Sequence, residues 1–416
     1  MKKKKLLILA GQSVHCKVVE AAKELGFFTV VADYLQDSPA KRIADESVLL
    51  SITDVEAITE YCRKNKIDGV LNYCNDLAQI PYHQICENLG LPCYSTGKSV
   101  DILTNKREFK KYCRIHGLDV VPDYSEEDID AITDYPVLVK PTDSRGSRGQ
   151  TVCRNVEELR HAIDRAKSES RENRCVIEKY MGGKQDFSLV YLVIDSEPYL
   201  MKIGDRYIGR AVDNLDRQHI CTLLPSVHAD EFINGIEQKI KNFIKSLGIS
   251  FGPVFFQGFY DDGKVFFYDP GMRFPGSDYD LAVVRTTGFN PIRTMVRFAM
   301  TGDSTSCEGD PRKAFMLNGK TCMILSIAVR PGVIIRMQGF ETIRSDSRIC
   351  SFSQNYTVGD TVPDSGDYKQ RIAELIGVFN SREEAMKYVT DLYKDIAVED
   401  IDGDMVVSKI GIDIPF

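Results

Sequence analysis

The sequence predicts a chain that begins as an α/β unit with a parallel sheet and ends in an α+β region. Three observations predict this class. Short apolar runs alternate with helical patterns over the first part of the chain. A later strand ends in Lys140 and runs into a loop rich in glycine, serine and arginine. Two further strands are joined at Asp261-Asp262-Gly263, a strong hairpin signal.

Composition limits the class of protein. The chain has 416 residues, and at roughly 100–200 residues per domain this suggests two to four domains. The apolar fraction of 43% is enough to build cores. A net charge of −7 argues against nucleic acid as the main partner, because phosphate backbones need a concentrated basic face. The 12 cysteines contain no Cys-x-x-Cys pair and fit the reduced thiols of a cytoplasmic protein.

The first ten residues superficially look like a secretory signal, since Lys2–Lys5 precede the apolar run Leu6–Ala10. That run is too short for a signal peptide, and polar residues follow it at once. No stretch approaches the roughly 20 apolar residues that span a bilayer. We therefore expect a buried first strand and no membrane segment.

The N-terminal region alternates strands and helices, which implies a parallel sheet with helices on both faces. Ligands of such sheets bind at the carboxyl ends of strands, where Asp33 follows the second strand; a helix cap or loop is the alternative for this residue. Gly11-Gln12-Ser13 is no G-x-G-x-x-G, so no dinucleotide site is predicted. The expected elements are strand Leu6–Ala10, helix Val14–Leu25, strand Phe28–Val31, helix Val55–Asn65 and strand Gly69–Leu71.

A second unit begins near Thr104, and the pattern changes again after about residue 305. We expect domains at residues 1–104, 105–305 and 306–416. The middle unit is expected to contain helix Asn105–His116, strands Tyr135–Lys140 and Thr151–Cys153, helix Val156–Ala166, strand Cys175–Tyr180, strands from Phe187 to Ile203, helix Phe232–Leu247, and strands Val254–Tyr260 and Lys264–Asp269. The last unit is expected to contain strands Ile324–Val329 and Gly332–Arg336, helix Arg382–Asp395 and short final strands.

The segment after Lys140 has the composition of a phosphate-binding loop. Glycine lets backbone N–H groups approach an anion, serine adds hydroxyl donors, and arginine adds forked, charged donors. The spacing is not that of a P-loop, and composition alone leaves a solvent-exposed turn equally open. The candidate residues are Ser144, Arg145, Gly146, Ser147, Arg148 and Gly149.

Val-x-Val-Lys-Pro, a short polar gap and Gly-Ser-Arg-Gly resemble the glycine-rich lid of the ATP-grasp superfamily, here about residues 135–180. Three more segments follow the order of that superfamily: Asn105–Phe109, Glu178–Met181 and Asp186–Leu189. The resemblance covers roughly residues 1–300 and implies a Rossmann-like N-terminal domain, an ATP-grasp domain and a C-terminal α+β domain. Segments from Val329–Ile334 onward are similar to L-amino-acid ligases and related carboxylate–amine ligases, among which the large subunit of carbamoyl-phosphate synthase also carries this unit.

The resemblance implies ATP as a cofactor and gives roles to individual residues. Lys106 and Lys140 would place point charges on the phosphates. Glu178 would accept from the adenine amino group, and Asp186 would meet the ribose. For Lys106 and Glu178 taken singly, a solvated surface charge is the alternative. The segment expected to hold the adenine ring consists of Glu178, Lys179, Tyr180 and Met181.

The metal site departs from the pattern of the superfamily. Gln257 stands where a glutamate is usual, Asp269 takes the second acidic position, and Gly271 replaces an asparagine. A three-residue hairpin loop would put Gln257 across from Phe267, with Asp269 as a diagonal neighbour. Mg²⁺ tolerates few carboxylates when phosphates and waters complete its shell, so Asp269 and the Gln257 carbonyl are expected to bind one ion; a second ion is left open.

Arg273 aligns with the arginine that contacts the acyl phosphate in this superfamily, which implies a catalytic role. A surface or interface ion pair is the alternative for it. The implied reaction joins a carboxylate, from an amino acid or small carboxylic acid, to an amine through an acyl phosphate, with release of ADP and phosphate. The partners would be small molecules, without nucleic acid or membrane, and a homodimer is one option.

Two other functions stay open. The lid and the C-terminal Arg330-Pro331-Gly332 also suit an enzyme that forms carboxyphosphate from bicarbonate. The depleted metal site favours a nucleotide-binding protein without catalysis.

Overall fold

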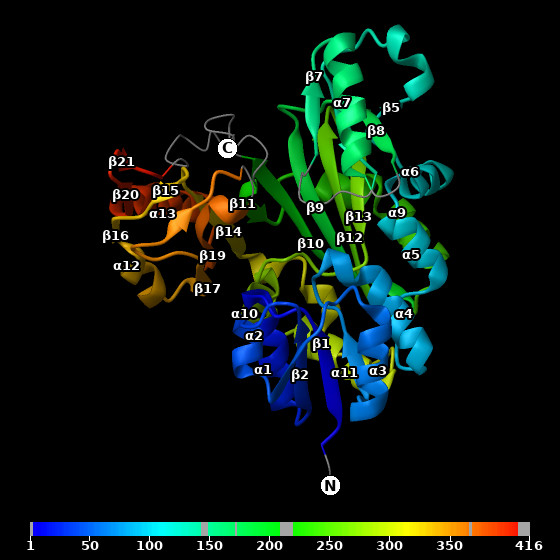
Figure 1. The fold of residues 1–416 in the computed structure, drawn as a ribbon, viewed down its shortest axis with the longest axis vertical. Helices are drawn as coiled ribbons and strands as arrows, with labels where there is room; N and C mark the ends of the chain where they lie inside the picture. Colours follow the sequence, from blue (N-terminus) through cyan, green and yellow to red (C-terminus); the bar gives the residue numbers. More distant parts are fainter. Residues whose placement is uncertain (1–2, 143–148, 171–172, 209–218, 366–367, 407–416) are drawn as a thin grey trace.

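The computed structural model describes residues 3–142, 149–170, 173–208, 219–365 and 368–406. An N-terminal unit lies at one end of the molecule and a small sheet with one long helix lies at the other (Figure 1). A large twisted sheet runs between them, and the C-terminal elements lie to its side (Figure 1). Within the described ranges, every helix is too short or too polar to cross a membrane.

The N-terminal unit is a parallel sheet, as predicted, and its strands lie in the order β3-β2-β1-β4. Its strands are β1 (Lys5–Leu9), β2 (Phe28–Asp33), β3 (Glu46–Leu49) and β4 (Gly69–Leu71). Its helices are η1 (Ser13–His15), α1 (Cys16–Glu24), α2 (Pro39–Ile43), α3 (Val55–Asn65), η2 (Asp76–Ala78) and α4 (Gln79–Leu89). Asp33 is the last residue of β2 and not the residue after it. Its carboxylate accepts from the N–H groups of Gly11 and Leu35 at 2.7 and 2.8 Å, so it holds two loops together.

The distal unit is a four-stranded sheet in the order β5-β8-β6-β7, covered by one helix. Its elements are β5 (Asp123–Tyr124), η3 (Glu126–Ala131), β6 (Val137–Pro141), β7 (Thr151–Cys153), α7 (Val156–Glu169) and β8 (Cys175–Lys179), and it is preceded by α5 (Gly97–Thr104) and α6 (Lys106–Ile115). Helix α6 begins one residue after its expected start, because Asn105 caps it: the Asn105 side chain accepts from two free N–H groups of the first turn. A separate small core forms around Val137, Val139 and Leu159.

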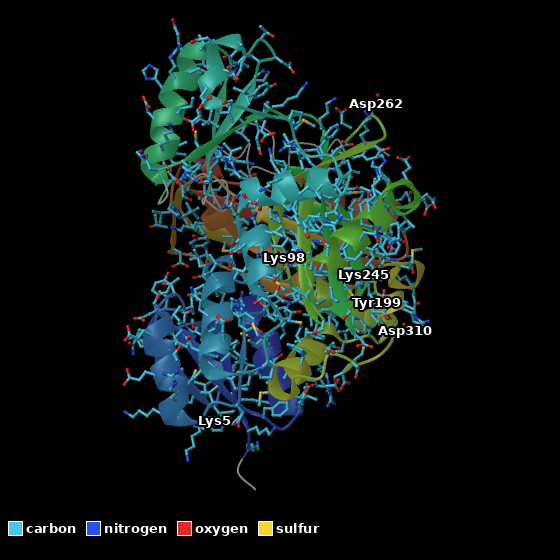
Figure 2. All side chains as sticks on the ribbon, turned by 90° about the vertical axis from the view of Figure 1, so that its right-hand side faces the viewer. Lys5, Lys98, Tyr199, Lys245, Asp262 and Asp310 are labelled. Atoms are coloured by element: carbon cyan, nitrogen blue, oxygen red, sulfur yellow. The ribbon has the colours of Figure 1, made fainter. Side chains whose placement is uncertain are left out.

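The large sheet has eight antiparallel strands in the order β13-β12-β9-β10-β11-β14-β19-β17. These strands are β9 (Gln185–Ile194), β10 (Glu197–Ile208), β11 (His219–Leu224), β12 (Gly252–Asp261), β13 (Lys264–Gly271), β14 (Thr321–Ala328), β17 (Ile349–Gln354) and β19 (Arg371–Phe379). The predicted hairpin joins β12 to β13, and its tip at Asp262 lies far from Lys5 at the start of β1 (Figure 2). Strands from beyond residue 305 extend this sheet, so it continues across the expected boundary; the three-domain division stays a prediction.

The remaining elements cover the sheet or form its C-terminal margin. They are α8 (Ala229–Gly235), α9 (Glu237–Ser246), α10 (Tyr279–Thr287), α11 (Pro291–Thr301), η4 (Pro311–Lys313), η5 (Leu317–Gly319), β15 (Gly332–Val333), β16 (Arg336–Gln338), α12 (Phe340–Ser345), β18 (Thr361–Val362), η6 (Tyr368–Gln370), α13 (Arg382–Asp395), β20 (Ala397–Asp400) and β21 (Gly403–Asp404).

Two predicted elements are each divided in two. The helix expected over 232–247 belongs to α8, which ends at Gly235, and to α9, which starts at Glu237; glycine is a weak helix former. The strand expected over 332–336 is split between β15 and β16. The reason is that β15 pairs with β18, whereas β16 pairs with β20.

Candidate functional site

One carboxylate holds two buried lysines between the distal unit and α6. Lys140, on β6, places its Nζ 2.6 Å from Glu178 Oε2 on the neighbouring strand β8. Lys110, on α6, lies 2.5 Å from Glu178 Oε1 and donates to the carbonyl of Val121 at 2.9 Å. All three side chains are almost completely buried. Lys110 was missed from the sequence, although it lies four residues after Lys106 and thus on the same helix face.

The charges of this cluster favour binding of an anion. Burial alone would raise the pKa of Glu178, but Lys140 and Lys110 outweigh it and hold the pKa below its usual value. Burial lowers the pKa of Lys140, and Glu178 opposes that shift. Two cations therefore share one carboxylate in a site shielded from water. Such an excess of positive charge suits phosphate oxygens.

Gly149 is the described end of the predicted phosphate loop. Its φ of +70° lies in the left-handed region. A Cβ there would come within 2.9 Å of the Pro141 side chain, so this position requires glycine. The other loop candidates, Ser144, Arg145, Gly146, Ser147 and Arg148, lie outside the described residues, and their contact with phosphate stays a prediction.

The segment predicted to hold adenine begins with the last two residues of β8, Glu178 and Lys179, and continues past the end of the strand. Met181 is buried, Tyr180 is exposed, and Lys179 forms an ion pair with Asp134 at 2.8 Å. The N–H groups of Lys179 and Tyr180 donate to the carbonyls of Pro122 and Pro136. Those two N–H groups thus anchor the segment. Because the Glu178 carboxylate is shared by two lysines, its contact with adenine stays a prediction.

Asp186 is buried and forms a polar triad with two partly buried residues, Arg206 and Tyr268, from two other strands. Arg206 Nη1 donates to Asp186 Oδ2 at 2.8 Å and to the Tyr268 hydroxyl at 3.0 Å. That hydroxyl lies 3.2 Å from Asp186 Oδ1. Burial raises the pKa of Asp186 to about 6, although Arg206 opposes the shift. The Tyr268 ring also lies 5.6 Å from Lys140 Nζ, so the triad adjoins the lysine cluster. The ribose contact stays a prediction.

Gln257 and Asp269 are directly paired across β12 and β13. The expected register, with Phe267 across from Gln257, is wrong for two reasons. The turn has two residues, Asp262 and Gly263, both with positive φ. An irregularity between Gln257 and Gly258 then shifts the pairing by one residue.

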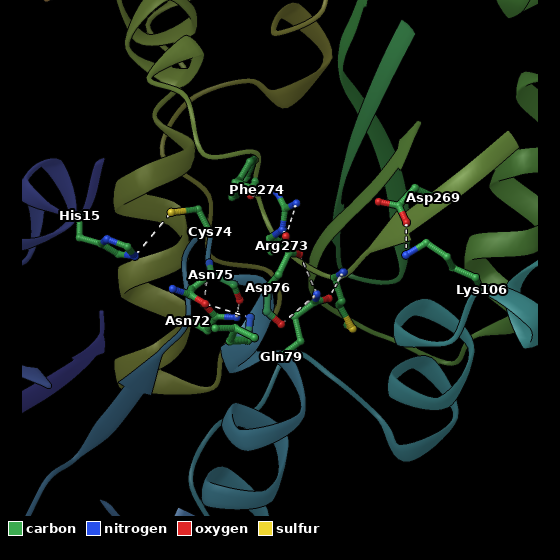
Figure 3. Close-up of polar contacts among 12 residues, drawn as sticks. His15, Asn72, Cys74, Asn75, Asp76, Gln79, Lys106, Asp269, Arg273 and Phe274 are labelled. Atoms are coloured by element: carbon green, nitrogen blue, oxygen red, sulfur yellow. Dashed lines mark hydrogen bonds and ion pairs between the residues drawn. The ribbon is translucent and has the colours of Figure 1, made fainter. Parts of the chain in front are cut away.

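The metal-ligand candidates fit a single Mg²⁺ ion. A directly opposed carboxylate and amide supply two hard oxygen ligands, and Mg²⁺ commonly takes its remaining ligands from phosphates and waters. Asp269 Oδ1 also lies 3.0 Å from Lys106 Nζ, which brings together a predicted ligand and a predicted phosphate contact (Figure 3). Within the described ranges, no cluster of three or more His, Cys, Asp or Glu side chains forms a complete metal site.

Arg273 is held by an acid of the N-terminal unit (Figure 3). Its guanidinium forms a forked ion pair with Asp76, with Nη2 2.9 Å from Oδ2 and Nε donating to Oδ1. Nη1 donates to the Phe274 carbonyl at 2.9 Å, and the guanidinium stacks 4.9 Å from the Phe255 ring. This side chain is only 13% exposed, so of the two alternatives a surface ion pair does not describe it, whereas an ion pair at the interface with the N-terminal unit does.

Helix α4 supports this ion pair. Gln79 donates through Nε2 to Asp76 Oδ1 at 3.1 Å and accepts from the N–H of Met272 at 2.5 Å. Sequence reasoning missed both Asp76 and Gln79. Their signal was their place just after β4, since polar residues at the carboxyl ends of parallel strands often meet ligands.

A second connection fixes the N-terminal unit to the segment after β13. Lys17 Nζ lies 2.7 Å from Asp280 and 3.0 Å from Asp278. The Tyr73 hydroxyl also donates to Asp280, which is fully buried. Removing one partner of such a buried network would leave an uncompensated charge, so the network fixes where Asp76 meets Arg273.

Lys202 is a buried cation on the same sheet. It lies on β10 opposite Val190 and four residues before Arg206. No carboxylate in the described part of the chain forms an ion pair with it, and its Nζ lies 5.0 Å from the Tyr279 ring. Burial lowers the pKa of Lys202 to about 7, and the charge of Arg206 adds to this shift. Sequence reasoning missed it because it interrupts an apolar strand without any motif.

Ser188 lies on the same face of the sheet as Lys202 and the metal-ligand candidates. It pairs with Gln257 on one side and Gly204 on the other, so Asp269, Gln257 and Ser188 form one row across three strands. Lys202 is two residues from Gly204 and lies diagonally from this row. Ser188 Oγ is buried and has no hydrogen-bond partner among the described residues. This face therefore offers a donor and a cation beside the row.

Comparison with known proteins relates this geometry to a family. Residues 108–250 match the family described as carbamoyl-phosphate synthase L chain, ATP binding domain. The chain is 26% identical over 258 residues to the formate-dependent phosphoribosylglycinamide formyltransferase of Prochlorococcus marinus (strain MIT 9313), which is 59% of this chain and 64% of that protein. The chain thus spans less than two thirds of the length of this relative.

Solved structures match nearly the whole chain. An L-amino acid ligase from Bacillus licheniformis superimposes with a TM-score of 0.76 and 18% identity, covering 96% of this chain and 99% of that one. The biotin carboxylase domain of the Hydrogenobacter thermophilus 2-oxoglutarate carboxylase, in complex with MgADP, ADP and bicarbonate, gives 0.75 and 18%, covering 96% and 91%. These likenesses show the fold. The family match over residues 108–250 and the shared fold agree with the predicted resemblance to the ATP-grasp superfamily.

Proposed function

We propose that the chain is a Mg²⁺-dependent, ATP-consuming ligase that joins a carboxylate to an amine through an acyl phosphate. One observation carries the proposal: the three groups all border β13, since Lys140 lies 5.6 Å from the Tyr268 ring, Asp269 pairs with Gln257, and the clamped Arg273 follows the strand by two residues. Phosphoryl transfer is catalysed mainly by positioning and by fixed cations, which these residues provide. No nucleophilic side chain is needed.

Each group has a defined task in this reaction. Lys140 and Lys110, oriented by Glu178, bind nucleotide phosphates, and Lys106 supplies a third charge beside Asp269. When bound, Mg²⁺ would supply positive charge that offsets the charge of the phosphates. Asp269 and Gln257 would hold this ion.

Arg273 would stabilise the negative charge that develops as the acyl phosphate forms and as the amine attacks it. Its forked ion pair with Asp76 fixes the guanidinium plane before substrate arrives, so little reorganisation is needed. Lys202 and Ser188 offer a cation and a hydroxyl to the carboxylate of the acid substrate. A bound carboxylate would also compensate the buried charge of Lys202.

The matched proteins support a small acid as the substrate class. The relative from Prochlorococcus is named for its dependence on formate, and the structural match from Bacillus licheniformis is an L-amino acid ligase. We infer that the acid is an amino acid or another small carboxylic acid. All 12 cysteines are free thiols, which supports a reducing, cytoplasmic setting.

A second candidate is carboxyphosphate formation from bicarbonate. The observation that favours it is the structural match to a biotin carboxylase domain in complex with bicarbonate. A binding protein without catalysis is favoured by Gln257 in place of an acid. The two catalytic functions differ in which substrate triggers ADP release, and the non-catalytic function predicts no ADP release.

The test is ADP release with pooled amino acids, pooled small carboxylic acids or bicarbonate, each with and without added amines. The proposal expects release that needs an organic acid and yields an amide detectable by chromatography. Release that needs only bicarbonate would establish the carboxyphosphate reaction instead. ATP binding in calorimetry without turnover across the whole panel would leave only the non-catalytic function.

A further inference from the structure

Two cysteines meet at the end of α4, away from the lysine cluster. Cys86 is buried on the last turns of the helix, and Cys93 is half-buried in the segment that follows. The two thiols lie close enough for each to shift the pKa of the other. Cys93 Sγ also lies 3.2 Å from Ser95 Oγ and 3.7 Å from His83 Nδ1. The cluster thus contains two thiols, a hydroxyl and an imidazole.

Local structure holds these groups together. His83 and Cys86 are three residues apart on α4 and share one face of the helix. Gly90, with φ of +63°, ends the helix and turns the chain back along it. The N–H of Tyr94 then donates to the Tyr82 hydroxyl at 3.1 Å, and their rings stack at 4.3 Å. Cys93 is therefore fixed against α4.

We propose that Cys86 and Cys93 form an oxidation-sensitive dithiol that reacts with hydroperoxides. The Cys93 thiolate attacks one peroxide oxygen, the O–O bond breaks, and the peroxide leaves as an alcohol or as water after taking up a proton. The product is a sulfenic acid on Cys93. The Cys86 thiol then attacks that sulfur, a disulfide forms and water leaves. Two electrons pass from the thiols to the peroxide.

The protonation states of the two thiols separate their roles. Hydrogen bonding from Cys86 lowers the pKa of Cys93 to about 5; burial opposes this shift, and Ser95 and His83 add to it. The hydrogen bond to Cys93 and burial raise the pKa of Cys86 well above its usual value. The thiolate is the nucleophile, so Cys93 is the attacking group and Cys86 the resolving group.

Three other half-buried thiols provide matched controls. Cys16, Cys307 and Cys350 have intermediate exposure like Cys93, but burial raises the pKa of each. The lowered pKa of Cys93 is therefore due to its neighbouring side chains and not to its exposure.

Helix α4 connects this dithiol to the clamp on Arg273. Gln79, at the first residue of α4, contacts Asp76 and the backbone of Met272. The Tyr94 hydroxyl donates to the carbonyl of Asn72 at 2.7 Å, in the loop that leads to Asp76. A disulfide at the far end of α4 is therefore expected to disturb the segment 72–79 from both sides.

The first experiment is alkylation of the reduced full-length protein with iodoacetamide at pH 6, read by peptide mass spectrometry. Cys93 should react at least about 10-fold faster than Cys16, Cys307 or Cys350, because only it is largely thiolate at that pH. His83→Gln should slow Cys93 and leave the three controls unchanged. Equal rates at Cys93 and the controls would overturn the proposal.

The second experiment adds hydrogen peroxide to the wild type and to two conservative variants. The wild type should form a Cys86–Cys93 disulfide that dithiothreitol reverses. Cys86→Ser should stop at a dimedone-trappable sulfenic acid on Cys93, and Cys93→Ser should leave Cys86 as a thiol. Wild-type oxidation that leaves Cys86 as a free thiol would overturn the assignment. Hydrogen exchange at 72–79 should rise in the oxidised wild type only, and unchanged exchange there would overturn the connection through α4.

Discussion

The residues proposed to bind ATP, here called the nucleotide side, and those proposed to act on the acid substrate, here called the acceptor side, balance their charges differently. On the nucleotide side, Lys140 and Lys106 already have acid partners, Glu178 and Asp269. On the acceptor side, Lys202 has no carboxylate partner among the described residues. The first arrangement keeps lysines oriented before ATP binds. The second leaves a buried charge that a substrate carboxylate would compensate, so the two sides are prepared for ligands in opposite ways.

The largest expected effect is at Asp269, the single carboxylate among the ligand candidates. Asp269→Asn should lower Mg²⁺-dependent turnover by on the order of 10³-fold or more, because metal catalysis contributes several kcal/mol. Gln257→Glu should preserve or strengthen Mg²⁺ binding. The measurement is ADP release over a Mg²⁺ titration, with Asp262→Asn at the exposed hairpin tip as the control. Full turnover in Asp269→Asn would place the metal elsewhere.

Arg273 tests whether the acceptor side acts in the transition state. Arg273→Ala should keep ATP affinity and lower kcat for amide formation by about 10²–10³, as for other fixed charge stabilisers. Lysine should rescue incompletely because it lacks the planar fork. Asp76→Asn should lower kcat less, since it frees the guanidinium without removing it. Calorimetry and product chromatography measure the two quantities.

The control for Arg273 is Arg312→Ala, which removes an exposed arginine that also pairs with an acid, Asp310. Surface pairs of this kind contribute about 0–1 kcal/mol, so kcat should not change. Product formation at the wild-type rate in Arg273→Ala would contradict the catalytic role. Loss of ATP binding together with kcat would instead indicate misfolding.

Lys140 tests the nucleotide side. Lys140→Met should weaken ATP affinity by about 10–100-fold, because a hydrogen bond to a charged group contributes about 1.5–3 kcal/mol. The fold should persist, since Lys110 still neutralises Glu178. Lys387→Met, which removes an exposed lysine that pairs with Asp391 on α13, is the matched control. Equal ATP affinities of the two variants in calorimetry would remove Lys140 from the phosphate site.

Lys202 tests whether the acceptor side holds an uncompensated buried charge, because such a charge lowers the free energy of unfolding of the ligand-free protein. Its pKa of about 7 in the folded protein lies below the roughly 10.4 of an unfolded chain, so the folded state binds fewer protons between these values. Its contribution therefore becomes less destabilising as pH rises from about 7 to about 10. Lys202→Met should stabilise the ligand-free protein most at pH 6.5, by a few kcal/mol at about 1.4 kcal/mol per pKa unit.

Urea unfolding at pH 6.5 and pH 9.5 measures this gain. The gain should shrink at pH 9.5, where the lysine in the folded protein is already neutral. Lys245→Met, an exposed lysine paired with Glu197, should change stability little at either pH. A Lys202→Met variant that is equally destabilised at both pH values would show that the lysine is compensated in the folded protein.

The two sides also differ in how far the sequence predicts them. Lys140 and Glu178 belong to short motifs on adjacent strands, so local pattern and resemblance find them. The Asp76–Arg273 pair joins residues 197 positions apart, and no local pattern specifies such a contact. The register at Asp269 was wrong because the turn has two residues instead of three and because a one-residue irregularity has no clear sequence signal. Lys202 was missed because hydrophobic periodicity assigns its strand without regard to one buried cation.

The most direct test of the central proposal follows an oxygen atom. The acid substrate found in the ADP-release panel is labelled with ¹⁸O in its carboxylate, and the phosphate released with ATP and amine is analysed by mass spectrometry. An acyl phosphate requires that one carboxylate oxygen leaves with the phosphate, so labelled phosphate should form in step with the amide. Amide formation accompanied only by unlabelled phosphate would contradict the account.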